Sequence, residues 1–292
     1  MDSVFVAVGL PAALAVVMLG LGLSLTVADF RRVAQRPLPV AAALGTQLVV
    51  LPALCFGMVL ALGLDPVLAA GMMLLAASPG GTTANLFSHL FRGDVALNIT
   101  LTAVNSVLAV VTLPVVLGLS LGWFGLDGSV GLQGGKALQV FAVVLVPVVL
   151  GMLIRRVAPG FADRADRPVR ILSALVLAGV IIGALLSERE ALPGVVAEVG
   201  PAVVLLGAVS LALGYLLPRL LRVGHPQAVA SSFEVGIHNS TLAIAVAVGV
   251  LGVERLAVPA AVYGVLMFPL ALAAGFLLRR LAPGRTPAPV TV

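Results

Sequence analysis

The sequence predicts an all-α polytopic membrane protein, and the composition, the length of the apolar runs and the placement of basic residues all support this fold class. Of 292 residues, 61% are hydrophobic and 10% are charged, whereas a soluble domain is about half apolar and about a quarter charged. A helix needs roughly 20 mostly apolar residues to cross a bilayer, so the chain has room for about nine or ten such helices.

Nine apolar runs separate the clusters of charged residues, and each is expected to form one membrane span. The runs cover residues 4–28, 38–62, 67–90, 95–123, 137–157, 169–186, 195–218, 226–250 and 256–278. Asp2 precedes the first run and no basic residue does, so this run lacks the basic region of a secretory signal peptide and is expected to stay as a span. The single cysteine, Cys55, excludes an internal disulfide and a cysteine cluster for a metal.

The basic residues predict the orientation in the membrane. Alternate loops hold almost all of the 17 lysines and arginines, and the opposite loops hold only Lys136, Arg189 and Arg255. Because positively charged loops stay in the cytoplasm, we expect the tail at 279–292 to be cytoplasmic and the N-terminus to lie outside, in the inner (cell) membrane. The net charge of +5 is thereby explained by membrane orientation, and nucleic acid is not expected as a partner.

Two of the runs are interrupted by helix-breaking or polar residues. The third contains Ser78–Asn85, with the sequence SPGGTTAN, and the eighth contains Phe233–Ser240, with the sequence FEVGIHNS. Proline followed by two glycines breaks a helix, and a new helix can begin after them. Because paired interruptions at matching places in two halves are typical of transporters built from inverted repeats, we expect an inverted repeat of four and five spans.

Glu234 is the acidic residue that lies near the middle of a run. A charge at the bilayer centre costs at least about 2.5–3.5 kcal/mol, so such a residue is a candidate for a functional site. The alternative is a protonated glutamate that is bonded to a neighbouring helix.

Further polar side chains accompany this carboxylate. Asn98, Thr102 and Asn105 share one face of the fourth run because they are spaced by four and three residues. Their oxygens are of the type that a hard cation prefers, although hydrogen bonding between helices explains such a stripe equally well. Asn85 and Gln47, each taken alone, are better explained by packing. One carboxylate with several neutral oxygens nevertheless suits a monovalent cation such as sodium.

The new helix that is expected after the first interruption also predicts an anion site. Its N-terminal amide groups, near Thr82 and Thr83, attract anions through the helix dipole. They could therefore hold the carboxylate or sulfonate of a substrate beside the cation. The chain has no phosphate-binding loop with lysine, no His-Glu-x-x-His and no Gly-x-Ser-x-Gly motif, so an enzyme is not expected.

Four segments resemble the motifs of the bile acid:sodium symporter family, in the same order along almost the whole chain. They are Gly20–Phe30, Ser78–Asn85, Arg92–Asn98 and Glu234–Ser240. The resemblance implies one transporter domain over 1–292 in the nine-span arrangement of a bacterial member, in which two broken helices cross. It also implies a core domain, with spans near 38–123 and 195–278, and a panel domain, with spans near 4–28 and 137–186.

The resemblance further implies two sodium sites and a substrate cavity. The first sodium site would use Asn85, Asn98, Thr102, Glu234 and the backbone oxygen of Ala84, which stands where the family often has serine. The second would use Gln47, Glu234, His238 and the backbone near Val235 and Ile237. The substrate would contact Gly81, Thr82, Thr83, Asn239, Met267 and Phe268.

Besides Ala84, the chain departs from the family pattern in two further places. His238 stands where the family usually has glutamine, and an imidazole is a poorer sodium ligand that repels the ion when it is protonated. We therefore expect uptake to fall as the pH drops through the range in which histidine protonates, and an unchanged pH profile in His238→Gln would contradict this. Met267 and Phe268 replace a His-Asn pair of some bacterial members, which predicts a more apolar cavity.

The expected function is sodium-coupled symport of a small organic anion, bile-acid-like or another carboxylate or sulfonate, by alternating access with one or two sodium ions. One alternative is a proton-coupled or exporting carrier of the same fold, such as an arsenite or auxin carrier. A membrane receptor that binds the ligand without moving it is another.

Overall fold

The computed structural model describes residues 33–126, 134–165 and 192–281, together with a few positions within 15–31 and 168–175. The regular structure in these parts is helical, apart from one isolated backbone bridge between Gly80 and His238. Within the described residues, four stretches are long and apolar enough to cross a membrane: Pro37–Ala61, Val95–Trp123, Val196–Leu220 and Glu254–Arg280. The prediction of an all-helical membrane protein is therefore confirmed.

The helices follow the apolar runs closely. They are α3 (Pro37–Gly45), η2 (Thr46–Val50), α4 (Leu51–Ala61), α5 (Pro66–Ala77), α6 (Thr82–Leu90), α7 (Val95–Trp123), α8 (Gly134–Val157), α10 (Leu192–Leu220), α11 (His225–Gly236), α12 (Ser240–Ile244), η3 (Ala245–Val250) and α13 (Glu254–Arg280). The expected spans at 4–28 and 169–186 lie largely outside the described residues, so the count of nine stays a prediction.

Aspartates begin two of these helices. The Asp65 carboxylate accepts hydrogen bonds from the backbone N–H groups of Val67 and Leu68 at 3.0 and 3.3 Å. Asp94 does the same for Leu97 at 3.0 Å. Both side chains satisfy amide groups that the first turn of a helix leaves free, and they fix where α5 and α7 start.

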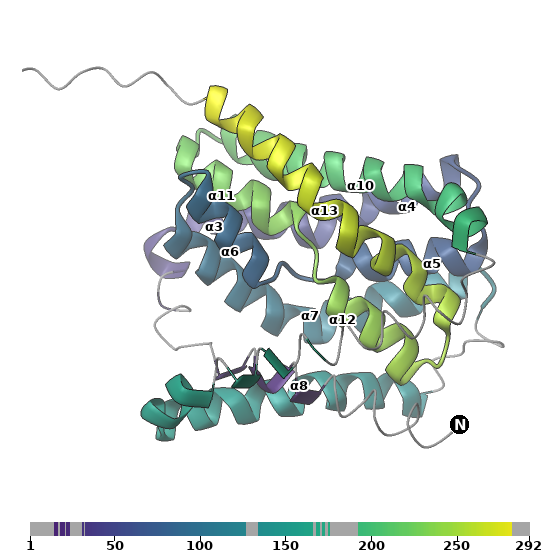
Figure 1. Ribbon diagram of the computed structural model, residues 1–292, viewed down its shortest axis with the longest axis horizontal. Helices are drawn as coiled ribbons and strands as arrows, with labels where there is room; N and C mark the ends of the chain where they lie inside the picture. The colour runs from purple at the N-terminus through teal and green to yellow at the C-terminus, as the bar shows by residue number, and fades with distance from the viewer. Residues whose placement is uncertain are drawn as a thin grey trace, which may run out of the picture.

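The two interrupted runs do break, and the breaks meet. The chain is extended at Ser78 and Gly81 between α5 and α6, and α11 stops at Gly236 before α12 begins at Ser240. At the crossing, Gly80 pairs with His238, and the N–H of Asn239 donates to the Pro79 carbonyl at 2.8 Å. Figure 1 shows α5–α6 and α11–α12 with their connecting segments inside the bundle. Each break thus supplies backbone partners for the other.

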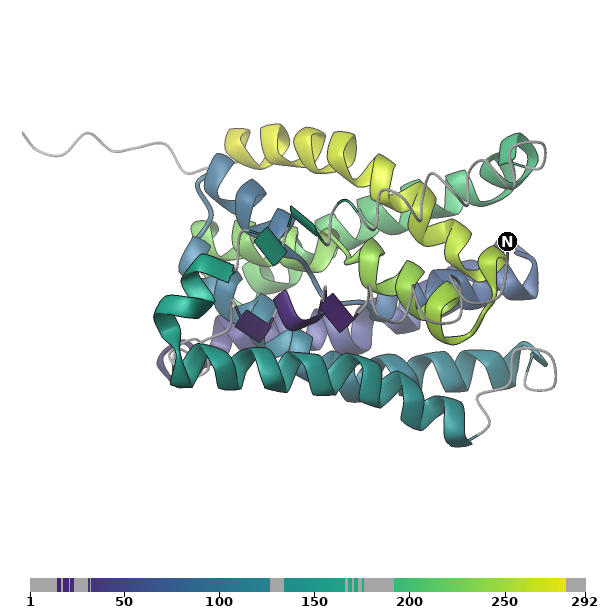
Figure 2. The same ribbon diagram turned by 60° about the horizontal axis from the view of Figure 1, so that its bottom comes forward.

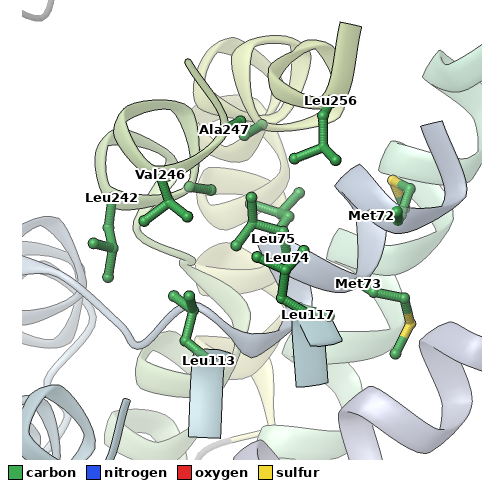
Figure 3. Close-up of a cluster of buried hydrophobic side chains, with 14 of the residues drawn as sticks. Met72, Met73, Leu74, Leu75, Leu113, Leu117, Leu242, Val246, Ala247 and Leu256 are labelled. Atoms are coloured by element: carbon green, nitrogen blue, oxygen red, sulfur yellow. The ribbon is translucent and has the colours of Figure 1, made fainter. Parts of the chain in front are cut away.

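The core surrounds α5, in which every residue from Leu68 to Ala77 is buried. Figure 3 shows Leu74 and Leu75 of α5 near Leu113 and Leu117 of α7, with side chains of α12, η3 and α13 on the other side. A Cβ at Gly71 would lie 2.4 Å from the Leu256 carbonyl, so this glycine allows α5 and α13 to pack closely. In a bilayer the hydrophobic effect does not drive helices together, and small residues commonly allow the close packing that does.

The outer surface of the bundle is apolar. Helix α7 exposes Val111, Val115 and Leu119, which are four residues apart and form one stripe, while polar side chains on another face of the helix are buried. This reverses the arrangement of a soluble helix and agrees with a surface that faces lipid.

Helix α8 runs along one side of the bundle in both views (Figure 1, Figure 2) and contacts α7 and η3. A Cβ at Gly151 of α8 would lie 2.5 Å from the Leu19 carbonyl and 2.7 Å from the Leu23 nitrogen. The described part of the first apolar run is therefore packed directly on α8.

Candidate cation site

A fully buried carboxylate, Glu234 on α11, forms the centre of the site. The Thr102 hydroxyl donates to its Oε2 at 2.6 Å, and the Asn105 amide Nδ2 donates to its Oε1 at 3.0 Å. Both donors come from α7 and both are neutral. Among the described residues no lysine, arginine or histidine forms an ion pair with Glu234, so this carboxyl group has no basic partner in that part of the chain.

The first break lies directly against this carboxylate. A Cβ added at Gly80 would lie 2.5 Å from Cδ and Oε2 of Glu234 and 2.6 Å from Oε1. Real side chains do not approach that closely, so residue 80 has to be glycine for the breaks to cross at this point. Gly80, one of the two glycines that predicted a broken helix, therefore also makes room for the acidic group, whereas a Cβ at Gly81 would meet nothing within 4 Å.

Asn98 joins three helices around the same point. Its Nδ2 donates to the Ser88 hydroxyl at 2.6 Å, the Ala230 carbonyl at 2.9 Å and the Ala84 carbonyl at 3.4 Å. The Thr102 hydroxyl also lies 3.4 Å from Asn98 Oδ1. The polar stripe of α7 thus faces α6 and α11, and Asn98, Thr102 and Glu234 form one connected group.

Several oxygens near the crossing are buried without a hydrogen-bond partner in the described structure. They are Oδ1 of Asn85, Oδ1 of Asn105 and Oε1 of Gln47. A buried polar atom without a partner costs about 1–3 kcal/mol, and a hard cation is the partner that such oxygens suit. The described residues contain no group of three His, Cys, Asp or Glu side chains that could hold a metal ion. One carboxylate among neutral oxygens is a set of ligands that suits a monovalent cation.

The residues expected at a second sodium site lie around the other side of the crossing. Gln47, in the π-helical turn η2, donates from Nε2 to the Ser78 carbonyl at 3.1 Å and to the Ala76 carbonyl at 3.3 Å. His238 is buried, with Nε2 3.2 Å from the Ser210 hydroxyl and its ring centroid 5.1 Å from that of Tyr263. Val235 and Ile237, whose backbone was expected to contribute, are buried as well.

The residues expected to contact the substrate fall into two places. Gly81 and Asn239 lie at the crossing, where the Asn239 side chain accepts the Leu242 N–H at 3.0 Å and so caps α12. Thr83 is partly exposed in the first turn of α6, and the side chain of Thr82 lies outside the described structure. On α13, Met267 packs against the apolar clusters, and the Phe268 ring lies 6.4 Å from that of Phe87 on α6.

Three residues of the site were not foreseen as partners of these groups. Asn105 was seen as part of the stripe but not as a partner of the carboxylate, although its three-residue spacing from Thr102 carried that signal. Ser88, which accepts from Asn98, and Ser210, which contacts His238, carry no signal that separates them from other serines in apolar helices.

The comparisons place the chain among membrane transporters. Its residues 11–193 match the sodium bile acid symporter family, and the chain belongs to this family. The resemblance found in the sequence motifs is thereby confirmed.

Individual relatives carry transporter descriptions. The chain is 27% identical over 252 residues to an uncharacterized sodium-dependent transporter, YocS, of Bacillus subtilis, which covers 86% of this chain and 77% of that protein. It is 32% identical over 258 residues to the probable sodium/metabolite cotransporter BASS2, chloroplastic, of Oryza sativa, over 86% of this chain and 59% of the relative. It is 30% identical over 274 residues to a BASS1 protein of Arabidopsis thaliana with the same description, over 92% and 66%. The chain thus spans less than two thirds of these plant relatives.

Proposed function

We propose that this chain is a secondary active transporter in which sodium ions drive the symport of a small organic anion by alternating access. The observation that carries the proposal is Glu234, a fully buried carboxylate that, within the described part of the chain, is held only by neutral donors. An uncompensated charge at membrane depth is costly and is kept where an ion or proton passes. The description of relatives as sodium-dependent transporters supports sodium as that ion.

One transported sodium ion would bind between α6, α7 and α11. Its ligands would be the oxygens of Asn85, Asn98, Thr102 and Glu234 with the Ala84 carbonyl. Oδ1 of Asn85, which has no hydrogen-bond partner among the described residues, supports this set. A second ion would bind between Gln47, Glu234 and His238 with the carbonyls near Val235 and Ile237, where Gln47 Oε1 has no partner in the described residues.

The substrate anion would bind at the start of α6. The amide groups of Thr82 and Thr83 begin a nine-residue helix at the crossing, and the positive end of its dipole attracts a carboxylate or sulfonate. Gly81 and Asn239 flank this point, and Met267 and Phe268 would contact the apolar body of a bile-acid-like substrate. Because the anion and the cation would share one crossing, each would favour the binding of the other, which is the physical basis of coupling.

Alternating access would move a panel of spans near 4–28 and 137–186 against a core of spans near 38–123 and 195–278. The close approach of Gly151 to Leu19 and Leu23 supports movement of α8 with the first run. The close approach of Gly71 to Leu256 supports a rigid core. The transporter would sit in the inner membrane with its N-terminus outside and its C-terminus in the cytoplasm.

Thermal unfolding of the purified protein in sodium, potassium or choline chloride tests the proposal. A ligand at 100 times its dissociation constant stabilises the folded state by about 2.7 kcal/mol. We expect sodium alone to raise the melting temperature, and Glu234→Gln to abolish the rise. Glu198→Gln, a change at an exposed acid on α10, is the matched control and should keep it. Equal melting of the unmodified protein in all three salts would refute sodium coupling and favour a proton-coupled carrier.

A further inference from the structure

Asn105 touches the candidate cation site, but neither the family motifs nor the proposed ligand set includes it. It lies one turn beyond Thr102 on α7 and is almost completely buried. Its Nδ2 donates to Glu234 Oε1 at 3.0 Å, while its Oδ1 is buried with no hydrogen-bond partner in the described structure. The amide nitrogen thus forms a hydrogen bond, and the amide oxygen forms none within the described structure.

Two neighbouring hydroxyls on α7 are satisfied without any ligand. The hydroxyls of Thr100 and Ser106, on the same helix, donate to carbonyls one turn earlier at 2.9 and 2.7 Å. These two hydroxyls are thus satisfied within the helix. Thr112 Oγ1, two turns farther along α7, is also buried without a partner among the described residues, but Asn105 is the one whose other amide atom bonds to Glu234. A leucine would fill the place of Asn105 without burying an unpaired carbonyl. Packing alone therefore does not explain an amide oxygen at this position.

A cation beside Glu234 provides that reason. The N–H of Asn105 and the O–H of Thr102 now cover both carboxylate oxygens with hydrogens, which repel a cation that approaches the same oxygens. A hydroxyl can turn its lone pairs toward the ion. An asparagine amide can do the same, because its terminal torsion is broad and roughly two-fold, and half a turn exchanges Nδ2 for Oδ1.

We infer that Asn105 Oδ1 is an additional ligand of the cation that binds at Glu234. Without the ion the amide nitrogen holds the carboxylate, and with the ion the amide turns and its oxygen joins the coordination shell. The inference rests on the proposed function, since it needs a cation at this carboxylate. It makes Asn105 a residue that sets the affinity of that site, in addition to holding Glu234.

Two substitutions separate a ligand from a mere hydrogen-bond donor. Asn105→Leu removes both the donor and the oxygen. Asn105→Asp keeps the oxygen in place and removes the donor. A ligand role predicts that the aspartate variant binds sodium more tightly than the leucine variant. A donor-only role predicts the reverse, because a second carboxylate then repels Glu234 and offers it no hydrogen.

The experiment measures the sodium concentration that gives half of the thermal stabilisation, in choline-balanced salt. For Asn105→Leu we expect that concentration to rise about tenfold or more, a loss typical of one coordinating or positioning group. Asn105→Asp should stay closer to the unmodified protein. Ser106→Ala is the matched control, because its hydroxyl is buried on the same helix and bonds only within it. Asn105→Ala replaces the leucine variant if that variant does not fold.

An unchanged sodium requirement in the leucine or alanine variant overturns the ligand role and leaves the proposed function standing. Aspartate and leucine variants that are equally weak also overturn it. If the unmodified protein shows no sodium-specific stabilisation, the proposed function fails and the role of Asn105 fails with it.

Discussion

Thr102 Oγ1 lies 2.6 Å from Glu234 Oε2, although 132 residues separate the two in the chain. The bond joins α7 of the first half to α11 of the second half, immediately beside the place where the two breaks cross. The hydroxyl and the carboxylate therefore tie the interrupted helices to the long helix that supports them, and the strength of this tie can be measured.

Removal of the Thr102 hydroxyl should weaken both the fold and the response to sodium. Thr102→Val leaves a buried carboxylate oxygen without its donor, which costs about 1–3 kcal/mol. We expect a lower melting temperature in choline and a higher sodium requirement for stabilisation. Thr100→Val is the control, because its hydroxyl bonds only to the Ala96 carbonyl of its own helix. Equal effects of the two substitutions would show that the contact with Glu234 is not special.

A side chain at residue 80 should push the carboxylate out of place. In Gly80→Ala the new Cβ would meet Glu234 at 2.5–2.6 Å, and overpacking of this kind costs about 1–3 kcal/mol. We expect destabilisation together with loss of the sodium effect in thermal unfolding. Gly57→Ala on α4 is the matched control, since nothing lies within 4 Å of its new Cβ, and it should stabilise the protein by about 0.5–1 kcal/mol. A Gly80→Ala protein that still responds to sodium would contradict the close approach described here.

His238→Gln should make sodium-driven uptake depend more steeply on sodium concentration. An amide oxygen is a better ligand for a hard cation than an imidazole nitrogen, and Oε1 of the nearby Gln47 has no hydrogen-bond partner in the part of the chain that the structure describes. The imidazole should leave the proposed second site weakly occupied in the present chain, so the Hill coefficient should rise from about 1 toward about 2 in the variant, since it is limited by the number of sites. Uptake into proteoliposomes measures this, with the exposed His89→Gln as control. An unchanged Hill coefficient would show that no second ion binds at His238, either because it binds at another place or because only one ion is transported.

The ion pairs at the beginnings of α5 and α13 should contribute less to the free energy of unfolding than the N-terminal cap of α5, which shares Asp65 with them. Arg255 approaches Asp65 at 3.4 Å and Glu198 at 3.7 Å with all three side chains partly exposed, and such pairs are worth about 0–1 kcal/mol. Asp65 also caps α5, and loss of a cap costs about 0.5–2 kcal/mol.

Thermal unfolding should therefore rank the variants clearly. Asp65→Ala is expected to destabilise more than Arg255→Ala, and Asp65→Asn, which keeps a capping oxygen, should lose little. If Arg255→Ala proved the most harmful of the three, the salt bridge and not the cap would be the main stabilising contact at this end.

Much of the fold could be predicted from the sequence because long apolar runs have one stable form in a bilayer. The run at 95–123 coincides with α7, and the run at 38–62 differs by one residue at each end from α3–α4. The π-helical turn η2 within that run, which contains Gln47, was not predicted, because a run of apolar residues does not distinguish a π-helical turn from an α-helical one. Helix breaks at Pro79 and Gly236 were predictable from residue chemistry alone.

The sequence predicted which residues belong to the candidate site, but it did not predict which hydrogen bonds they form. Spacing identified the face of α7, and charge identified Glu234. Which amide meets which oxygen depends on how α6, α7 and α11 cross, and that is a matter of side-chain packing between distant segments. The contact of His238 with Ser210 likewise follows from the close packing of α10 on α11.

The crossing has a consequence for biogenesis. The Pro79 carbonyl accepts its hydrogen bond from Asn239, and Gly80 pairs with His238. The backbone groups of the first break therefore have no hydrogen-bond partner of this kind until most of the chain has left the ribosome. Lipid cannot satisfy free backbone groups. The inserted first half must therefore be sheltered by the translocon or by water until the second half arrives. A nascent chain that stops before residue 225 should be a preferred substrate for membrane quality control.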